Sequence, residues 1–408
     1  MTKSDLRLPG IPNLHSHAFQ RAMAGLTERR TNPADSFWTW RELMYRFAAR
    51  ITPESLHAIA AQLYVEMLEA GYTTVCEFHY LHHQPDGRPY VDPSAMSQAL
   101  IQAARDAGIR LTLLPVLYMT GGFGGRPLSE RQRRFGHSVE DFLALIERLR
   151  AQESDTLKIG IALHSLRAVP EAAMREVLAA LAKHRLPIHI HIAEQTAEVD
   201  ECLALRGARP VEWLLANAEV NTDWTLVHAT HLDETEVQRI AASGATVAIC
   251  TTTEANLGDG LFPLSQFIAA GGRFGVGSDS NTSVSPVEEL RWLEYGQRLA
   301  LRQRSIAVDS QEASVGALLL THAINDGRRS SQQLQSADDV LILDDCAPAL
   351  AGVVPENLED RFVFAGNRCL IREVVVAGKK VVENGRHPQA EAIADAYRRK
   401  LKQLLADA

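Results

Sequence analysis

Short apolar runs alternate along the chain with longer stretches in which apolar residues recur at helical spacing. The runs are rich in β-branched and aliphatic residues and end at turn residues, so each run predicts a strand. They comprise residues 8–14, 73–78, 110–118, 157–163, 187–192, 225–227, 245–250 and 273–276. The intervening stretches predict helices, as Leu56, Ile59, Leu63 and Met67 illustrate ahead of the stop at Gly71. Strands that alternate with helices are typical of a parallel sheet.

Histidines and an aspartate directly follow several of these predicted strands. His15 and His17 end the first strand, His191 and His228 end the fifth and sixth, and Asp279 follows the eighth. A doubly wound sheet gathers its polar residues at one switch point, whereas a (β/α)8 barrel collects them from all strands at one mouth. The sequence therefore predicts an α/β protein with a (β/α)8, or TIM-type, barrel.

The chain beyond the barrel predicts a small β appendage and a final helix over 390–405. The strand-like runs there are residues 339–343, 362–364 and 373–382. The domain division that we expect is a remnant of a small β domain at 1–8, the barrel at 9–335, and the appendage with its helix at 336–408. The polar and aromatic stretch 19–50 is too long for a tight connection, so we expect it to fold over the barrel mouth.

Composition narrows the class of protein. The 408-residue chain has a net charge of −8, which argues against a nucleic-acid or anionic-membrane partner. Its five cysteines are scattered and include no Cys-x-x-Cys pair, as is usual in a reducing compartment. The first residues lack the apolar core of a signal peptide, and no apolar run reaches membrane-spanning length. We therefore expect a cytoplasmic protein.

The pair His15 and His17 predicts a metal site, because residues two apart on a strand point to the same side. Together with His191, His228 and Asp279 they form a set of imidazoles and a carboxylate. Such a set suits one borderline cation, Zn²⁺ or Fe²⁺, and leaves a position for water. A bound ion lowers the pKa of that water toward neutrality, and Asp279 is placed to take its proton.

Glu194 follows the fifth strand and is placed to carry a proton to a leaving nitrogen, as a general acid and base. Plainer structural interpretations exist as well, since Asp279 alone could cap a helix and Glu194 alone could be a solvated acid. Other residues are explained more readily without chemistry: His189 as a core residue, Cys250 as a buried inert thiol, and His82 with His83 as part of an exposed loop.

Several motifs carry a resemblance to known proteins. His-Ser-His at 15–17, His-Ile-Ala-Glu at 191–194, His228 and Ser-Asp at 278–279 resemble the amidohydrolase superfamily. His164 stands where the binuclear branch has a lysine, which favours the mononuclear deaminase branch. Longer segments resemble the formimidoylglutamate deiminase family of histidine degradation; they are residues 13–25, 77–80, 132–135, 164–169, 189–195 and 252–260.

This resemblance implies a metal-dependent hydrolysis of N-formimidoyl-L-glutamate to N-formyl-L-glutamate and ammonia. It assigns one zinc or iron(II) ion to His15, His17, His191 and Asp279, and gives His228 a hydrogen bond to the attacking water or leaving group. The catalytic residues that follow are Glu194, His228 and Asp279. A homodimer is implied by the family alone.

A substrate with two carboxylates calls for guanidinium and hydroxyl donors around the mouth. The candidates for these substrate contacts are Gln20, Arg41, Tyr80, His164 and Arg167. The partner that we expect is therefore a small dicarboxylate molecule, with no nucleic acid or membrane involved.

The sequence departs from the family pattern in three places. The resemblance leads us to expect a longer β segment ahead of residue 8, a turn with glycine and proline within 326–339, and a proline in place of Thr251. The small β domain is accordingly expected to lack N-terminal strands and to keep an open edge.

Two other functions stay open at this point. One is a related deaminase that acts on a purine, pterin or triazine ring, which would be expected to use aromatic stacking rather than arginines. The other is a catalytically silent barrel that only binds a ligand.

Overall fold

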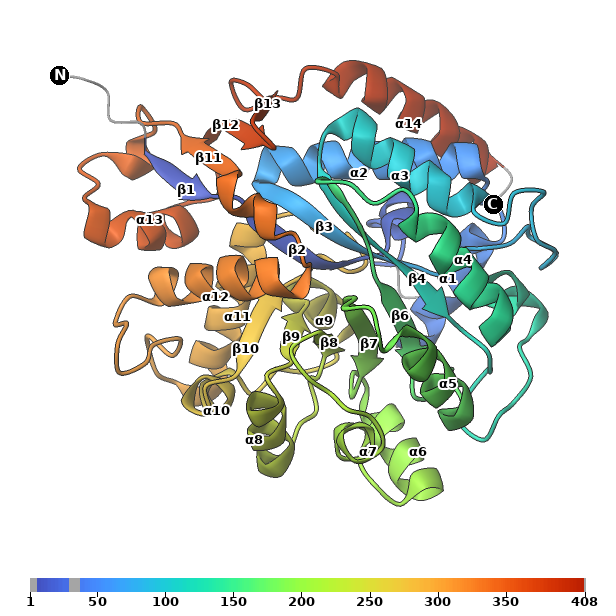
Figure 1. Cartoon of the computed structure of the whole chain (residues 1–408). Coiled ribbons are helices and arrows are strands. Elements are labelled where there is room, and N and C mark those ends of the chain that lie inside the picture. The colour runs from blue at the N-terminus through green and yellow to red at the C-terminus, as the bar shows by residue number, and fades with distance from the viewer. Residues whose placement is uncertain (1–5, 29–36, 407–408) are drawn as a thin grey trace.

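The computed structural model describes residues 6–28 and 37–406, and its centre is a barrel of parallel strands ringed by helices (Figure 1). Each strand pairs in parallel with the next one along the path, which confirms the (β/α)8 class. In order around the barrel the strands are β2 (Ile11–Ser16), β3 (Tyr72–His79), β4 (Arg110–Leu117), β6 (Ile161–Ser165), β7 (Ile188–Ile192), β8 (Trp224–His228), β9 (Thr246–Ile249) and β10 (Arg273–Val276).

The fourth run of the sequence forms two strands instead of one, because Gly160 separates β5 (Leu157–Ile159) from β6. Both strands pair with β4. A Cβ atom at Gly160 would lie 2.6 Å from Leu114 and from the carbonyl oxygen of Pro187, so only glycine fits this crossing. Both strands keep the same register with β4, so the chain stays in line in the barrel wall across the interruption.

The barrel closes between its first and last strands through an isolated parallel bridge of Ser16 and Asp279. The N–H of His17 donates to the carbonyl oxygen of Asp279, and the N–H of Asp279 donates to that of His15, both at 2.9 Å. The closure therefore brings the His-x-His pair of β2 directly beside the aspartate that follows β10.

The helices around the barrel bury one face and expose the other. Their ends follow sequence signals: Thr52 caps α2 and Gly71 ends it in a left-handed conformation, while Ser138 and Asp233 cap α4 and α8. The bounds are α2 (Pro53–Ala70), α3 (Ala95–Ala107), α4 (Val139–Arg150), α5 (Glu171–Leu181), α6 (Thr196–Arg206), α7 (Pro210–Asn217), α8 (Glu234–Ser243), α9 (Thr251–Leu257), α10 (Leu264–Ala269), α11 (Pro286–Leu301) and α12 (Val315–Ser330).

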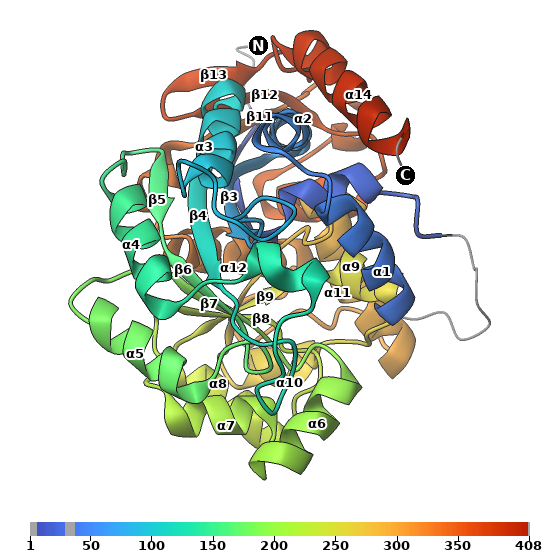
Figure 2. The same cartoon turned by 90° about the vertical axis from the view of Figure 1, so that its right-hand side faces the viewer.

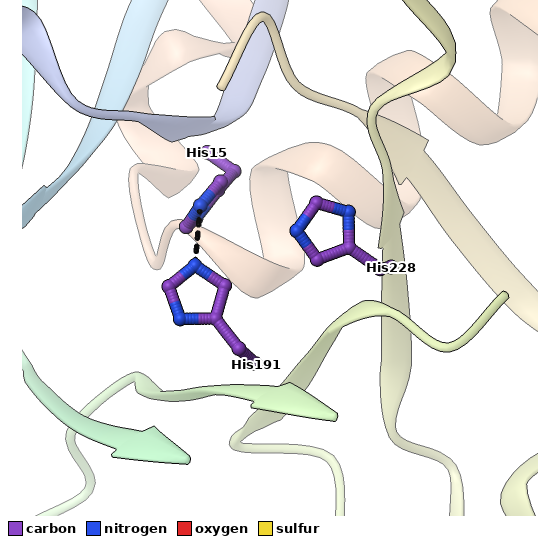
Figure 3. Close-up of side chains that lie close together, drawn as sticks. All are labelled: His15, His191 and His228. Atoms are coloured by element: carbon purple, nitrogen blue, oxygen red, sulfur yellow. Dashed lines mark hydrogen bonds between the residues drawn. The ribbon is translucent and has the colours of Figure 1, made fainter. Parts of the chain in front are cut away.

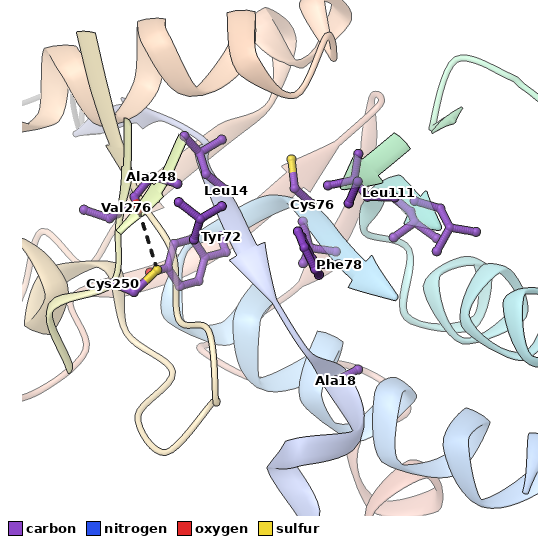
Figure 4. Close-up of a cluster of buried hydrophobic side chains, with 14 of the residues drawn as sticks. Leu14, Ala18, Tyr72, Cys76, Phe78, Leu111, Ala248, Cys250 and Val276 are labelled. Carbon is purple, nitrogen blue, oxygen red and sulfur yellow. Dashed lines mark hydrogen bonds between the residues drawn. The ribbon is translucent and has the colours of Figure 1, made fainter. Parts of the chain in front are cut away.

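The barrel strands are buried on both faces, as their near-continuous apolar runs require. Leu14, Tyr72, Phe78 and Val276 come from the three strands β2, β3 and β10 and are all at most 1% exposed. Figure 4 shows them in one apolar cluster with the thiols of Cys76 on β3 and Cys250 after β9. This core holds the strand ends in fixed positions, and the chemistry of the mouth depends on that.

A second, antiparallel sheet lies beside the barrel and joins the two ends of the chain. Its strand order is β1 (Arg7–Pro9), β11 (Val340–Leu343), β12 (Ile371–Val376) and β13 (Lys379–Val382). Residues 8–14 are thus divided at Gly10, where a side chain would overlap Thr73: the first part joins this sheet and the rest joins the barrel. Residues 1–5, at the start of the expected domain remnant, lie outside the described residues.

The prediction of a strand at 362–364 is wrong, because these residues end the helix α13 (Leu358–Phe364). The aromatic and β-branched letters suggested a strand, but Phe362 and Val363 fill a helix face buried against α12. Asp360 fixes the helix by accepting the N–H of Gly316 and the hydroxyl of Ser314, at 2.8 and 2.9 Å. The run 373–382 forms the hairpin β12–β13 rather than one strand.

The remaining elements cover the outside. The final helix α14 (Ala390–Ala406) runs along α2, as Figures 1 and 2 both show. No helix among residues 6–28 and 37–406 is long and apolar enough to cross a membrane. The other short elements are η1 (Ala18–Met23), α1 (Phe37–Ala48), η2 (Glu130–Phe135), η3 (Leu334–Asp338), η4 (Pro348–Leu350) and η5 (Pro355–Asn357).

Candidate metal centre and active-site pocket

Three imidazoles and one carboxylate converge at the carboxyl end of the barrel. The Nε2 atom of His15 lies 3.2 Å from Nε2 of His17 and 3.0 Å from Nε2 of His191. An oxygen of Asp279 lies 3.4 and 3.3 Å from the Nε2 atoms of His15 and His17. Ligands that are each about 2.1 Å from a tetrahedral ion lie roughly 3.4 Å from one another, a value that these four distances approach. His15, His17 and Asp279 form one group that could hold a cation, and His191 joins this group through His15.

The tautomers of two histidines also fit a metal ion. His17 Nδ1 lies 2.8 Å from the carbonyl oxygen of Phe78, and His191 Nδ1 lies 2.9 Å from that of His164. A carbonyl oxygen only accepts, so each Nδ1 carries the proton and each Nε2 presents a lone pair. A single Nε2–H on His15 cannot serve both of these lone pairs and the nearby Asp279 oxygen, whereas a divalent cation would bind them all.

Burial keeps these imidazoles neutral, as metal ligands must be. It lowers the pKa of His15 and of His191, and together with the charge of His15 it lowers the pKa of His17 to about 3. Burial acts in the opposite sense on Asp279, but the hydrogen bond and charge of His15 outweigh it, and the pKa of this carboxyl lies below its usual value. The donor set is therefore ready to bind a cation at neutral pH.

The strand ends that carry these side chains have an unusual backbone. Ala193, His228, Ala229 and Asp279 all have positive φ angles, between 46° and 67°, although none is a glycine. Such conformations are strained for residues with a Cβ and tend to occur where function fixes the chain. Here they turn each strand end sharply, so that the side chains point into the mouth.

A buried carboxylate supports the His-x-His strand from behind. One oxygen of Glu77 accepts the N–H of Ala18 at 2.6 Å, and the other lies 3.3 Å from the hydroxyl of Tyr64. Burial raises the pKa of Glu77 to about 8. This contact fixes the chain immediately after His17, and sequence reasoning gave Glu77 no role.

His228 stands beside the metal centre rather than within its closest set. Figure 3 shows its ring facing those of His15 and His191. Its Nε2 atom lies 3.8 Å from Asp279 and 3.9 Å from Glu194. Burial alone would lower the pKa of His228, but the charges of Glu194 and Asp279 and a hydrogen bond to Glu254 raise it to about 10. His228 is also close enough to His15 and His191 to form an alternative three-nitrogen group.

Glu194 is buried at the rim, and burial raises its pKa. The charge of His228 opposes this shift and that of Asp279 adds to it. A carboxyl whose pKa is raised toward neutrality can both take and return a proton, as a general acid and base must.

One pocket opens onto this centre, and every substrate-contact residue predicted from the sequence lines it. Gln20 donates to the hydroxyl of Tyr80 at 2.8 Å, so these two act as one unit. The Nε atom of Arg167 is buried and has no hydrogen-bond partner within the described part of the chain. His164 and Arg41 complete this predicted set. Their contacts with a substrate stay predictions.

The pocket also contains residues that sequence reasoning missed. They come from α1, from the segment after β4 and from α9; they are Trp40, Met44, Tyr45, Tyr118, Phe135, Thr253 and Leu257. The stretch 19–50 was expected to cover the mouth, and the described part of α1 does line it; residues 29–36 lie outside the described range. Phe135 belongs to a segment that the family resemblance already included, and this was a usable signal.

Three plainer interpretations can now be compared with the structure. Cys250 is fully buried, as that interpretation expects, and burial raises the pKa of its thiol well above the usual value; that the thiol is inert stays a prediction. His189 is also fully buried, as a core residue would be. The expectation of an exposed loop at His82 is wrong: this side chain is 1% exposed and lies 3.1 Å from the carbonyl oxygen of Val116.

Comparisons with known proteins agree with this geometry. The amidohydrolase family model matches residues 6–317. Formimidoylglutamate deiminase from Pseudomonas aeruginosa is 52% identical over 405 residues, which cover 98% of this chain and 89% of that protein. The chain belongs to the amidohydrolase family, in its formimidoylglutamate deiminase branch. The 8-oxoguanine deaminase of the same organism resembles this amidohydrolase less, at 30% identity over 72% of the chain and 64% of that protein.

Solved structures support the same assignment. An amidohydrolase from Brucella melitensis superposes on this amidohydrolase with a TM-score of 0.93 and 45% identity, over 98% of this chain and 90% of the other. A triazine hydrolase from an Arthrobacter species superposes with a TM-score of 0.83 at 21% identity, over 98% and 88% of the two chains, which shows a shared fold. Amidohydrolases depend on a metal ion, and the donor set at this barrel mouth fits one.

Proposed function

We propose that this amidohydrolase hydrolyses N-formimidoyl-L-glutamate to N-formyl-L-glutamate and ammonia. The observation that carries the proposal is its 52% identity to a formimidoylglutamate deiminase along almost the whole chain. The pocket adds chemical support, because Arg41 and Arg167 line it together with the metal centre. Two guanidinium groups suit a substrate with two carboxylates.

The reaction replaces the C=NH group of the substrate by C=O. Water supplies the oxygen and two protons, and the nitrogen leaves as ammonia. A divalent cation held by His15, His17, His191 and Asp279 would supply a bound water with a pKa near neutrality. We assign the native ion as zinc, with iron(II) as the alternative, and expect one ion per chain.

The chain's own residues handle the protons and the charge. Glu194 takes a proton from the attacking water and returns it to the departing nitrogen, since its raised pKa suits both tasks. His228 points its Nε2 atom at Glu194 and Asp279, where it can stabilise negative charge on the former water oxygen. Asp279 is the second group that can accept a proton from the attacking water. Arg167 and Arg41 fix the substrate carboxylates, and Gln20, Tyr80 and His164 orient the formimidoyl end.

A ring deaminase is the second candidate, because aromatic side chains such as Trp40, Tyr45 and Tyr118 also line the pocket. The two arginines favour the dicarboxylate, since a neutral ring offers no carboxylate to either guanidinium group.

The deciding experiment is ammonia release from N-formimidoyl-L-glutamate by protein of measured metal content, with guanine and 8-oxoguanine as comparison substrates. We expect turnover only with the formimidoyl compound. Faster turnover of a purine would favour the second candidate, and no turnover by fully metal-loaded protein would favour a silent binding barrel.

The place of this activity in the cell follows from its substrate. Formimidoylglutamate arises in histidine degradation, so we assign the protein to that pathway and to the cytoplasm. The family resemblance alone leads us to propose a homodimer. Light scattering of the purified protein tests the dimer, and loss of growth on histidine after deletion tests the pathway.

A further inference from the structure

The carboxylate of Glu254 faces the side of His228 that points away from the pocket. Glu254 lies in the first turn of α9, five residues after β9 ends at Ile249. Its Oε1 atom accepts the N–H of Cys250 at 3.0 Å, which folds the side chain back toward the strand end. The same Oε1 atom lies 3.2 Å from Nδ1 of His228. Both side chains are almost completely buried, at 2% and 1% exposure.

This contact determines the orientation of the His228 ring. Oε1 already accepts a peptide N–H, so it is an acceptor, and His228 Nδ1 must be the donor. The ring is then held with its Nε2 atom toward the pocket, 3.9 Å from Glu194 and 3.8 Å from Asp279. An imidazole that is not held from behind can flip its ring and exchange the two nitrogens, which would remove Nε2 from that position.

The helix that carries Glu254 is itself fixed at both sides. Glu289 of α11 is fully buried and accepts the hydroxyl of Thr251 at 2.7 Å and the N–H of Thr252 at 3.0 Å. Thr253 forms a hydrogen bond of 2.9 Å with Ser280, just after Asp279. Because α9 is tied to α11 and to the segment after β10, the Glu254 carboxylate has a fixed position.

The backbone at His228 makes such a hold necessary. His228 and Ala229 have φ angles of 67° and 49°, so the backbone is strained at the residue that carries the imidazole and at the next one. A strained segment returns to ordinary conformations unless its side chains are held by strong contacts. The Glu254 contact is the only hydrogen bond to the His228 ring within 3.5 Å that the described residues provide.

We propose that Glu254 is a positioning residue for the hydrolysis, which holds the His228 ring with Nδ1–H directed at Glu254 and Nε2 directed at the reacting groups. The inference rests on the proposed function, because it assigns a role to His228 in that reaction. It gives Glu254 no contact with the substrate. A purely structural role, in which Glu254 only caps α9, would leave turnover per folded and metal-loaded chain unchanged.

The experiment compares Glu254→Ala and Glu254→Gln with the wild-type enzyme. Glu254→Ala removes the acceptor, so kcat should fall on the order of 100-fold, with KM within about twofold and metal content unchanged. In Glu254→Gln the Cys250 N–H keeps the amide oxygen in place, and this oxygen can still accept from His228. We expect this variant to recover kcat to within about tenfold of wild type.

Glu294→Gln is the matched control. Glu294 is also fully buried, but it lies on α11 instead of α9. It accepts the backbone N–H groups of Ile306 and Ala307, in the segment after α11, at 2.9 Å. This control should keep kcat, even if its thermal unfolding midpoint falls. A comparable loss of kcat in Glu294→Gln would overturn the proposal, because general destabilisation would then explain the effect.

A readout without turnover separates this inference from the proposed function. Nitrogen-15 NMR of histidine-labelled enzyme distinguishes a protonated from a bare ring nitrogen, and His228→Asn identifies the signal. We expect the Nδ1–H signal of His228 to have the shift of a hydrogen-bonded proton in the wild type and in Glu254→Gln, and to lose that shift in Glu254→Ala. An unchanged Nδ1–H signal in Glu254→Ala, or a kcat within about twofold of wild type, refutes the positioning role even if formimidoylglutamate is not the substrate.

Discussion

Arg110 and Asp339 form a two-pronged ion pair between the barrel and the small sheet. The Nε and Nη2 atoms of Arg110 donate to the two carboxylate oxygens of Asp339 at 2.9 and 3.0 Å. Asp339 also accepts the N–H of Ala377, next to the β12–β13 turn. Both charged side chains are at most 2% exposed. This buried ion pair joins the two sheets beside the strand pair β1–β11.

We expect Asp339→Ala to lower the free energy of unfolding by about 3 to 5 kcal/mol, because it leaves the Arg110 guanidinium buried and unpaired. Urea denaturation at pH 7 measures the change. The double variant Arg110→Met with Asp339→Leu should recover most of the loss, since it removes both charges and keeps the volume. If the double variant is no more stable than Asp339→Ala, the unpaired charge is not the cause.

Removal of the metal ion should lower stability as well as activity. Donor atoms of His17, His191 and Asp279 lie 3.0 to 3.4 Å from Nε2 of His15, which cannot donate to all three of them, whereas a cation would bind the whole set. A chelator should therefore abolish ammonia release and lower the unfolding midpoint, and added zinc should restore both. Asp279→Ala should abolish turnover. Elemental analysis checks the expected ratio of one ion per chain, and full activity in Asp279→Ala would contradict the assignment.

The Arg167 guanidinium should bind substrate rather than take part in the chemical step. Arg167→Ala is expected to raise KM for formimidoylglutamate by roughly 10- to 100-fold, with kcat within about threefold. Steady-state kinetics separate the two constants. Arg175→Ala, which removes an exposed arginine paired with Glu171 on α5, should leave both unchanged. A fall in kcat alone for Arg167→Ala would move this residue from binding to catalysis.

The buried Glu289 should make stability depend on pH. Burial raises the pKa of this carboxyl from 4.5 to about 8 in the folded protein. The folded state therefore holds a proton that the unfolded state releases, and the stability from Glu289 is complete below about pH 4.5 and declines as pH rises to about 8. Relative to Glu289→Gln, the wild type should lose up to about 1.4 kcal/mol per pH unit in this range. Denaturation curves from pH 5 to 8 test this, and a constant difference would show that Glu289 does not titrate.

The barrel and its metal centre could be predicted from the sequence because two local signals coincide. Apolar runs defined the strands, and His15, His17, His191 and Asp279 follow such runs directly. In a parallel barrel the strand ends share one mouth, so residues far apart in the sequence must meet. The class of fold and the convergence of these residues follow from that topology.

Other features depended on contacts that leave no local pattern. Tyr45 and Tyr118 enter the pocket from α1 and from the end of β4, and nothing in their neighbouring residues indicates where those segments come to lie. Phe362 and Val363 have a strand-like composition, yet burial against α12 selects a helix. His82 lies in a polar loop, but its ring is enclosed by the His137 and His79 rings, at centroid distances of 4.3 and 5.0 Å.

The pairing of β1 with β11 has a consequence for how the molecule is made on the ribosome. The first strand is synthesised long before its antiparallel partner, and Ser16 likewise waits for Asp279 before the barrel can close. Until then the nascent chain exposes an unpaired edge and an apolar barrel wall, which is a state that aggregates readily. The full donor set exists only after Asp279 has been synthesised, so the cation can be bound by all four ligands only once the barrel is able to close.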